Sequence, residues 1–390
     1  DKLGRYLLKD EAFLIPELME LGFSKEEAEE MKTGTAPALF AEESFKKVKR
    51  ELGELPFEMK RLSSREEQFE GWMPVGVLGH VTSSNDAMLP FFSSVEGILA
   101  GNINVIKTAT GAHKVAMTLV EKLCELEPAL RPYYYVFPLS SKDENLLTNM
   151  FALCNGVAVW GSDGAVAGVR KLAPAGLKII EWGSRISFSY FTKDGWTREN
   201  LKGLAADVCV NDQQACSAPQ LVYYETESKE ELDAFAEELM EVLQEVSDTY
   251  PQHPMTTAEQ AELTTQIHLC HLDQLMEQGK LFDGQGCRIF VHYDNQLSAS
   301  PLYRTLLVKP IQKKDIISVL RPFRAYLQTV GLACGKEEMV GLTNLLVAGG
   351  ATRITQPGLM MGGYTGERLE LAAQLMMILG ICIVFNSIVL

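Results

Sequence analysis

One stretch of this sequence, residues 211–220, has the composition of a loop that presents a nucleophile. It reads Asn-Asp-Gln-Gln-Ala-Cys-Ser-Ala-Pro-Gln, with Cys216 among short polar residues. The β-branched and aromatic residues 221–225 that follow predict a buried strand. A cysteine placed just before a strand can be offered to a cleft, where its thiolate can attack an electrophile. The alternative is that Cys216 packs as a small apolar side chain, as most free cysteines do.

The elements that must position further chemistry lie upstream, between residues 75 and 181. The apolar patterns alternate between short runs typical of strands and longer amphipathic runs typical of helices. This alternation, with short connections, predicts a doubly wound parallel sheet. The expected strands are 75–81, 102–107, 133–137, 156–160 and 177–181, and the expected helices are 87–100, 113–126, 144–153 and 164–172.

Polar residues stand at the carboxyl ends of these strands, where such sheets bind ligands. Asn85 follows the first strand, Lys107 ends the second, Gly161 and Ser162 follow the fourth, and Glu181 ends the last. The glycine–serine turn would offer backbone N–H groups at a helix N-terminus to a phosphate. No strand is followed by GxGxxG, so the usual dinucleotide fingerprint is missing.

The flanking regions are less regular. In residues 1–70 we expect short amphipathic helices, one of them opened by a capping box from Ser24 to Glu27. The apolar run 375–390 is shorter than the roughly 20 residues needed to cross a bilayer, and we expect it to pack in the core. In the second half we expect helices 229–246, 257–278, 315–330 and one from 365 that ends before Gly380, and strands 286–293, 303–308 and 381–385.

Bulk composition excludes several classes of function. A formal net charge of −15 argues against a nucleic-acid partner, since no basic stripe is available for phosphates. The eight cysteines form no CxxC pair, and His268 and His271 lack a completing ligand, so we expect free thiols and no metal. Without a cationic–apolar leader, we expect a cytoplasmic protein.

The order of these residues resembles the aldehyde dehydrogenase superfamily. Within it, Ala-Cys216-Ser-Ala-Pro-Gln220 is similar to the LuxC-like acyl-CoA reductases of the bacterial bioluminescence type, and the resemblance runs from about Trp72 to the C-terminus. The matching pieces are Asn85, Leu99-Ala-Gly-Asn-Ile-Asn-Val-Ile-Lys107, Trp160-Gly-Ser162, Glu181-Trp-Gly183 and Gln214-Ala-Cys216.

The resemblance implies a role for each residue. Cys216 would take the acyl group as a thioester, and the Asn85 amide with the Cys216 backbone N–H would stabilise the oxyanion. Glu181 would be a general base. Lys107 would hold the adenosine ribose region of a nicotinamide cofactor, with its pyrophosphate at the turn of Gly161 and Ser162.

Position 110 bears on the choice of cofactor. In the superfamily, members that prefer NAD often carry a carboxylate three residues after the lysine, where it holds the ribose hydroxyls. Here that residue is Thr110, which does not repel a 2′-phosphate that Lys107 would attract. The resemblance therefore implies NADPH, with NADH also possible.

Each assignment has a structural alternative. Asn85 could cap the helix expected near residue 87. Lys107 could end its strand in solvent, and Glu181 could pair with Arg185 or be a vestige. The Glu-x-Phe-Gly-Pro motif of the superfamily has no clear counterpart, and residues 300–304 stand in its place. Residues 355–364 are candidates to line the acyl or nicotinamide pocket.

Together these features predict an aldehyde dehydrogenase-like α/β protein with two α/β domains and parallel-rich sheets. We expect an N-terminal helical segment (1–70), a cofactor-binding domain (71–181, completed by 365–390) and a catalytic domain carrying Cys216 (182–364). The predicted reaction is NAD(P)H-dependent reduction of a fatty acyl thioester, acyl-CoA or acyl-protein, to the aldehyde. An acyl-protein synthetase partner and a homo-oligomer are implied by the family. The alternatives are a hydrolytic or CoA-acylating aldehyde dehydrogenase, or a catalytically silent cofactor-binding or scaffold subunit.

Overall fold

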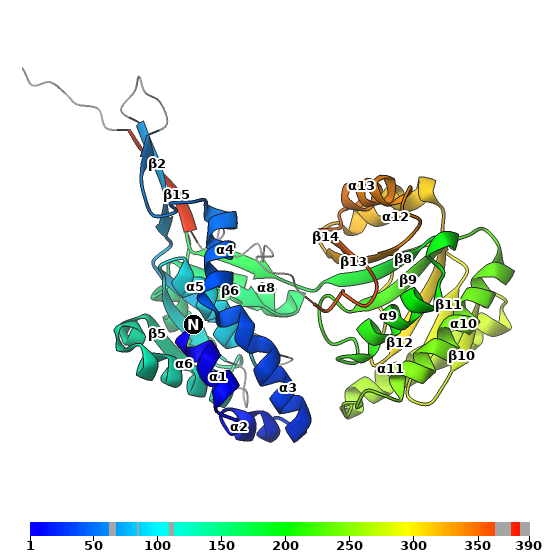
Figure 1. The fold of residues 1–390 in the computed structure, drawn as a ribbon, viewed down its shortest axis with the longest axis horizontal. Coiled ribbons are helices and arrows are strands. Elements are labelled where there is room, and N and C mark those ends of the chain that lie inside the picture. The colour runs from blue at the N-terminus through cyan, green and yellow to red at the C-terminus, as the bar shows by residue number, and fades with distance from the viewer. Residues whose placement is uncertain (62–67, 84–85, 109–112, 363–375, 383–390) are drawn as a thin grey trace, which may run out of the picture. The chain divides into compact units, whose positions relative to one another are not determined.

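The computed structural model describes residues 1–61, 68–83, 86–108, 113–362 and 376–382. The chain divides into two compact units (Figure 1). The first consists of Asp1–Gly183 and Tyr364–Leu390, and the second of Ser184–Gly363. Asn85 and Thr110, two of the predicted site residues, lie outside the described residues.

A five-stranded parallel sheet forms the centre of the first unit, with strand order β5-β4-β3-β6-β7. The predicted alternation of strand and helix is confirmed, with ends that differ by a few residues. The order reverses between β3 and β6, the point at which doubly wound sheets bind ligands. The strands are β3 (Val77–Val81), β4 (Ile103–Lys107), β5 (Tyr134–Phe137), β6 (Gly156–Trp160) and β7 (Lys178–Trp182).

Helices cover both faces of this sheet. On one face, apolar residues of α5, α6 and the N-terminal helices share a buried cluster with Ile106 and Tyr134. On the other face, α7 and α8 pack on Val81, Val105 and Val159. The predicted capping box of Ser24 and Glu27 is confirmed at the start of α3. The helices are α1 (Lys2–Lys9), α2 (Ile15–Glu20), α3 (Lys25–Thr35), α4 (Ala41–Leu52), α5 (Leu89–Leu99), α6 (His113–Leu126), α7 (Glu144–Ala152) and α8 (Asp163–Leu172).

The C-terminal apolar run corrects one prediction. Residues 376–379, expected to end a helix, belong to strand β15 (Met376–Cys382), which also includes Gly380. β15 pairs antiparallel with β2 (Gln68–Pro74), and β1 (Lys60–Arg61) pairs with the other edge of β2 (Figure 1). A short apolar run fits helix and strand equally well, so the partner strand decides. In the described part of the chain, no helix is long and apolar enough to span a membrane.

The second unit is built on a seven-stranded sheet of order β10-β11-β12-β9-β8-β13-β14. All neighbours are parallel except β10 and β11. The predicted strand 221–225 lies within β9. The strands are β8 (Ile186–Phe191), β9 (Pro219–Glu225), β10 (Gly279–Asp283), β11 (Arg288–His292), β12 (Thr305–Ile311), β13 (Leu327–Ala333) and β14 (Arg353–Thr355).

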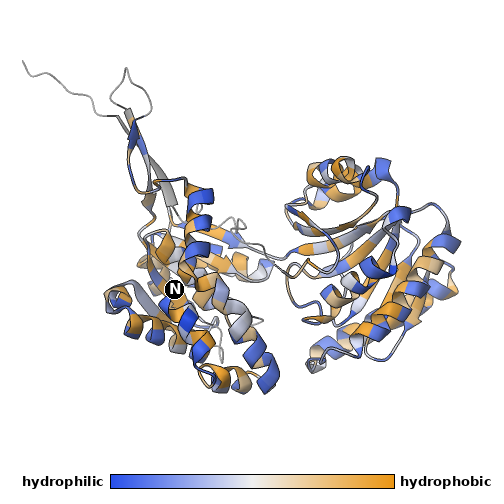
Figure 2. Cartoon of the chain, viewed as in Figure 1, coloured by the Kyte–Doolittle hydropathy of each residue, from blue (hydrophilic) through white to orange (hydrophobic). Residues whose placement is uncertain are grey.

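The helices of this unit mix hydrophilic and hydrophobic residues along their length (Figure 2). In α10 the buried residues recur at helical spacing, from Leu232 to Leu243, and pack against the sheet. The expected helix 315–330 is wrong. Helix α12 ends at Leu320, Pro322 stands in a 3₁₀ turn, and β13 follows, because proline cannot continue the helical hydrogen bonds. The helices are α9 (Arg198–Cys209), α10 (Lys229–Ser247), α11 (Thr257–Leu275), α12 (Ile316–Leu320) and α13 (Met339–Gly349).

Candidate active site

Cys216 lies in the turn that joins α9 to β9, and its side chain is exposed. The alternative in which this thiol is packed in the core is therefore wrong. Both ends of the turn are buried, at Gln213 and at Pro219. An exposed thiol between two buried anchors can meet a substrate without a large rearrangement of the chain.

The buried cysteines of the described chain offer a contrast. Burial raises the pKa of the Cys154 and Cys270 thiols to about 11 and that of Cys209 to about 12. These thiols are protonated at neutral pH, and reaction requires the thiolate. Cys334 is half-buried, and among the cysteines from Cys124 to Cys334 only Cys216 is exposed. Access thus favours Cys216 as the nucleophile.

Side chains from distant strands fix the backbone of the turn. The Ser187 hydroxyl at the start of β8 donates to the Cys216 carbonyl at 2.7 Å and accepts from the Thr329 N–H at 3.0 Å. The Gln213 side-chain amide donates to the Pro219 carbonyl at 2.8 Å. Among the described residues, none accepts a hydrogen bond from the Cys216 N–H. That N–H can therefore donate to an oxyanion formed at the thiol.

A loop from residue 356 to 362 lies beside the residue after the thiol. The Ser217 hydroxyl is 3.7 Å from the Met361 sulfur, within reach of a weak hydrogen bond. Asp207 of α9 holds the loop by accepting from the N–H groups of Gly358 at 2.6 Å and Met360 at 3.2 Å. Burial raises the pKa of the Asp207 carboxyl to about 6. These residues belong to the predicted pocket segment 355–364, and two methionines give it an apolar, adaptable surface.

In the first unit, strand register arranges Lys107, a predicted cofactor residue, and Glu181, the predicted general base. Val81 pairs with Lys107 on one side and with Val159 on the other, and Val159 pairs with Glu181. Paired residues point to the same face of a sheet, so the side chains of Lys107 and Glu181 lie on either side of Val81 and Val159 on one face. Three strand spacings separate their backbones by about 14 Å. The sheet therefore brings these residues to one edge but keeps them too far apart to pair.

Lys107 is only 5% exposed, so the alternative in which it ends its strand in solvent is wrong. Burial lowers the pKa of its ammonium group. Among the described residues, no carboxylate contributes to the shift of this pKa. A buried cation without a protein anion is expensive unless a ligand supplies the negative charge. This environment fits a phosphate- or ribose-binding lysine.

Gly161 and Ser162 form the turn from β6 into α8. The Gly161 N–H donates to the Trp182 carbonyl at 3.1 Å, which ties the turn to β7. The Ser162 hydroxyl accepts from the Ala165 N–H at 3.4 Å as the N-cap of α8. Ser162 is thus a helix cap, and it stands at the N-terminus of α8, an end of a helix that favours an anion.

Glu181 forms an ion pair with Arg170 of α8, through the Nε and Nη2 atoms of the guanidinium. The Nη2–Oε2 distance is 2.8 Å. The alternative pairing with Arg185 is wrong, since that side chain donates to the Ala325 carbonyl at 2.8 Å. Both carboxylate oxygens of Glu181 thus accept hydrogen bonds from Arg170.

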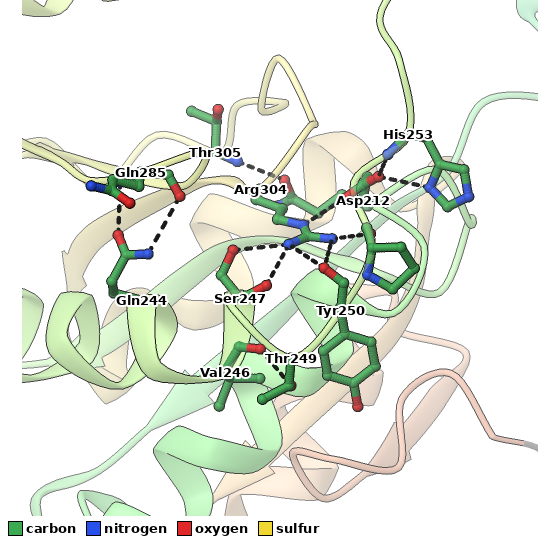
Figure 3. A network of polar contacts seen from close by, with 12 residues as sticks. Asp212, Gln244, Val246, Ser247, Thr249, Tyr250, His253, Gln285, Arg304 and Thr305 are labelled. Atoms are coloured by element: carbon green, nitrogen blue, oxygen red, sulfur yellow. Dashed lines mark hydrogen bonds and ion pairs between the residues drawn. The ribbon is translucent and has the colours of Figure 1, made fainter.

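The sequence analysis missed a set of buried polar residues behind the thiol turn, centred on Asp212 and Arg304 (Figure 3). Arg304 lies in the segment 300–304, which was considered only as a substitute for a missing motif. A buried arginine and its partner 92 positions away leave no local pattern in the sequence. Only the packing of the two loops shows that they meet.

Two solved structures define the class of fold. A benzaldehyde dehydrogenase from Corynebacterium glutamicum superposes with a TM-score of 0.74 at 14% identity, over 99% of this chain and 83% of that one. A lactaldehyde dehydrogenase from Escherichia coli gives 0.69 at 15% identity, over 97% and 84%. The fold is therefore that of the aldehyde dehydrogenases, as predicted.

A family model for "Acyl-CoA reductase (LuxC)" matches residues 7–375, and the chain belongs to this family. The long-chain acyl-protein thioester reductase 2 of Photobacterium leiognathi is 26% identical over 292 residues, covering 74% of this chain and 59% of its own. The long-chain acyl-protein thioester reductase of Aliivibrio fischeri is 26% identical over 298 residues, covering 73% and 59%. The chain thus matches less than two thirds of the length of these relatives. The predicted family resemblance is confirmed.

Proposed function

We propose that this chain reduces a fatty acyl thioester, acyl-CoA or acyl-protein, to the aldehyde with a nicotinamide cofactor. The observation that carries the proposal is the exposed thiol of Cys216 in a turn anchored at both ends, in a chain of the LuxC family. We further propose that residues 71–181, with 365–390, bind the cofactor, and that residues 182–364 form the catalytic domain.

In the proposed reaction the Cys216 thiolate attacks the carbonyl carbon of the thioester. The oxyanion accepts a hydrogen bond from the Cys216 N–H and, in our assignment, from the Asn85 amide. Collapse expels the donor thiolate and leaves an acyl–Cys216 thioester. A nicotinamide cofactor held by the first unit would supply the hydride that reduces the acyl carbon. The resulting thiohemiacetal oxyanion then collapses, which releases the aldehyde and regenerates the Cys216 thiolate.

The residues of the first unit fit such a cofactor. The buried Lys107 needs an anion or a ring of hydroxyls, and the turn of Gly161 and Ser162 opens a helix whose N-terminus suits a pyrophosphate. Thr110 carries no negative charge that would repel a 2′-phosphate. We therefore propose NADPH as the preferred cofactor, with NADH as the alternative.

The state of Glu181 supports reduction over hydrolysis. A hydrolytic aldehyde dehydrogenase needs a carboxylate that can take a proton from water as the water attacks the acyl group. Here Arg170 occupies both oxygens of Glu181. We propose that this ion pair restrains the position of the carboxylate, so that it activates water poorly and the acyl–Cys216 thioester survives until it is reduced.

The protein partner that we propose follows from the acyl donor that we propose. Two relatives are named for acyl-protein thioesters, so an acyl-protein synthetase is the partner we propose for that route, in the cytoplasm. A homo-oligomer is proposed on the family resemblance alone.

The first experiment is a panel of acyl-CoA thioesters from acetyl to palmitoyl, followed through the loss of NADPH absorbance. We expect turnover to peak with long chains. Turnover with short chains alone would move the protein to the CoA-acylating dehydrogenases. A scaffold subunit would give neither NADPH oxidation nor labelling of Cys216 by radiolabelled acyl-CoA, and that result would sink the proposal.

A further inference from the structure

A buried ion pair lies directly behind the thiol turn. Arg304 is 1% exposed and its Nε donates to Asp212, which is 2% exposed (Figure 3). The guanidinium also donates to the carbonyl and hydroxyl of Ser247, both at 2.9 Å, and to the carbonyls of Tyr250 and Pro251. We name Asp212 and Arg304 the clamp. Its charges are satisfied by hydrogen bonds, which a buried ion pair needs in order to be tolerated.

Asp212 also joins the clamp to the segment after α10. Its second carboxylate oxygen accepts from the His253 N–H and from His253 Nδ1, both at 2.8 Å. Its backbone carbonyl accepts from the Tyr303 N–H at 3.0 Å. One residue four positions before Cys216 thus makes side-chain contacts with two other segments of the unit. Moving Asp212 would break several buried hydrogen bonds at once.

The two loops that the clamp joins have strained backbones. Asp212 and Gln213 have φ angles of 45° and 62°, and Leu302, Tyr303 and Arg304 have 65°, 51° and 57°. L-residues other than glycine rarely adopt this left-handed region, because the Cβ atom then lies too close to backbone atoms. Such strain persists only where surrounding contacts determine it. The clamp supplies those contacts.

Gln213 transmits this geometry to the thiol turn. Its side-chain oxygen accepts from the Thr305 N–H at 2.9 Å, and its side-chain nitrogen donates to the Pro219 carbonyl at 2.8 Å. The side chain is 1% exposed. The bond to Pro219 closes a loop around Cys216, and the bond to Thr305 ties that loop to the residue after Arg304.

We propose that Asp212, Arg304 and Gln213 are positioning residues for Cys216, holding its thiol and its backbone N–H in the geometry that acyl transfer requires. The inference rests on the proposed function for the reaction that it serves. None of the three residues needs to touch substrate. Each acts through the backbone of the turn, so its loss should slow acyl transfer more than it slows reactions that need only an accessible thiolate.

The test uses the purified full chain with Gln213→Met and Asp212→Asn. Gln213→Met keeps the length of the side chain and removes both of its hydrogen bonds. Acylation of Cys216 by radiolabelled palmitoyl-CoA in a single turnover should fall 10- to 100-fold. Alkylation of Cys216 by iodoacetamide, measured from pH 6 to pH 10, should fall less than threefold. The effect on steady-state turnover should appear in kcat and not in KM for the thioester.

A matched control lies at the opposite end of β9. Glu231 accepts from the Thr226 hydroxyl at 2.6 Å and the Tyr224 hydroxyl at 3.0 Å, and no described contact of its side chain reaches the thiol turn. Glu231→Gln should lower the melting temperature without changing the ratio of acylation to alkylation. A clamp variant that stays folded and is acylated at the normal rate would overturn the proposal. Equal losses of acylation and alkylation would also overturn it.

Hydrogen exchange separates failure of the clamp from failure of the proposed function. In Gln213→Met, exchange of the backbone amides of residues 211–218 should accelerate at least tenfold, whereas Glu231→Gln should leave it unchanged. If the wild type is never acylated but this difference appears, the proposed function is wrong, whereas the inference that the clamp holds the turn is supported. If hydrogen exchange of residues 211–218 does not change in Gln213→Met, the inference that the clamp holds the turn is wrong, whichever substrate the protein uses.

Discussion

The sheet edge of the first unit and the thiol turn of the second position their polar residues by different means. Lys107 and Glu181 are held by strand register, since Lys107 ends β4, Glu181 is the last residue but one of β7, and strand pairing places both in the same row as Val81 and Val159. Cys216 is held by side chains, through Ser187, the clamp and Gln213.

This difference in how the residues are positioned indicates which of them can be substituted without disturbing their neighbours. A side chain at a strand end can be replaced while the backbone hydrogen bonds of the sheet keep its neighbours in place. A turn determined by buried side chains loses its shape when one of them is removed, because strained residues then relax. Substitutions at the edge should therefore have separable effects, and substitutions behind the turn should have coupled ones.

The largest effect is expected for Cys216→Ala. Without the nucleophile, acyl labelling and NADPH-dependent reduction should fall by roughly a thousandfold or more. Radiolabelled acyl-CoA and NADPH absorbance measure the two quantities. Cys334→Ala is the control, since that thiol is half-buried and should be dispensable. Labelling that persists on another cysteine would remove Cys216 from the mechanism.

Lys107→Ala should separate cofactor binding from acylation. Loss of one charge-assisted contact should raise KM for NADPH about 10- to 100-fold, while single-turnover acylation of Cys216 stays within twofold. The exposed Lys142 provides a control substitution of the same type, Lys142→Ala, that should change neither. If Lys107→Ala also lost acylation of Cys216, the prediction that substitutions at the sheet edge leave acylation intact would be refuted.

The contributions of His80 and Asp207 to the stability of their units should respond to acid in opposite directions. His80 is fully buried, and burial lowers its pKa to about 4, so between pH 6.5 and 4 the unfolded state binds the extra proton. The contribution of His80 to the stability of the first unit should fall by roughly 2 kcal/mol between pH 7 and pH 5. Asp207 is 3% exposed with its pKa raised to about 6, so between pH 6 and 3.8 the folded state binds the extra proton. The second unit should gain roughly 1 kcal/mol from Asp207 over the same interval.

Hydrogen exchange at pH 7 and pH 5, resolved by peptide, would follow each unit separately. Asp207→Asn should abolish the gain in the second unit and leave the loss in the first. His80→Gln should do the reverse. The assignment of these groups would be wrong if either variant changed the pH response of the other unit.

The smallest effect on reduction is expected for Glu181→Gln. Aldehyde formation from acyl-CoA should stay within about threefold, whereas oxidation of aldehyde to acid, where it occurs, should be suppressed because that step requires a base. Arg170→Met frees the carboxylate and should increase hydrolysis of the acyl–Cys216 thioester. Equal loss of reduction and oxidation in Glu181→Gln would show that its proposed role is mistaken.

The local sequence pattern was sufficient to predict much of the secondary structure of the first unit. Alternating apolar runs with short connections predicted the strands and helices from residue 75 to 181. Parallel strands place their carboxyl ends at one edge of the sheet, so Lys107 and Glu181 were expected at the same edge. The exposure of Cys216 was also predicted, since short polar residues around a thiol are poor core formers.

The sequence by itself therefore determined the order of the motifs, the parallel sheet and the candidate nucleophile, because these depend on side-chain periodicity and on neighbours in the chain. Only the tertiary structure decided that residues 376–379 form a strand, that Arg170 and not Arg185 pairs with Glu181, and that Arg304 supports the thiol turn. A strand needs a partner strand, and an ion pair needs two side chains brought into contact. Both conditions are met by segments that lie far apart in the chain. The local sequence does not indicate which distant segment will pack against it.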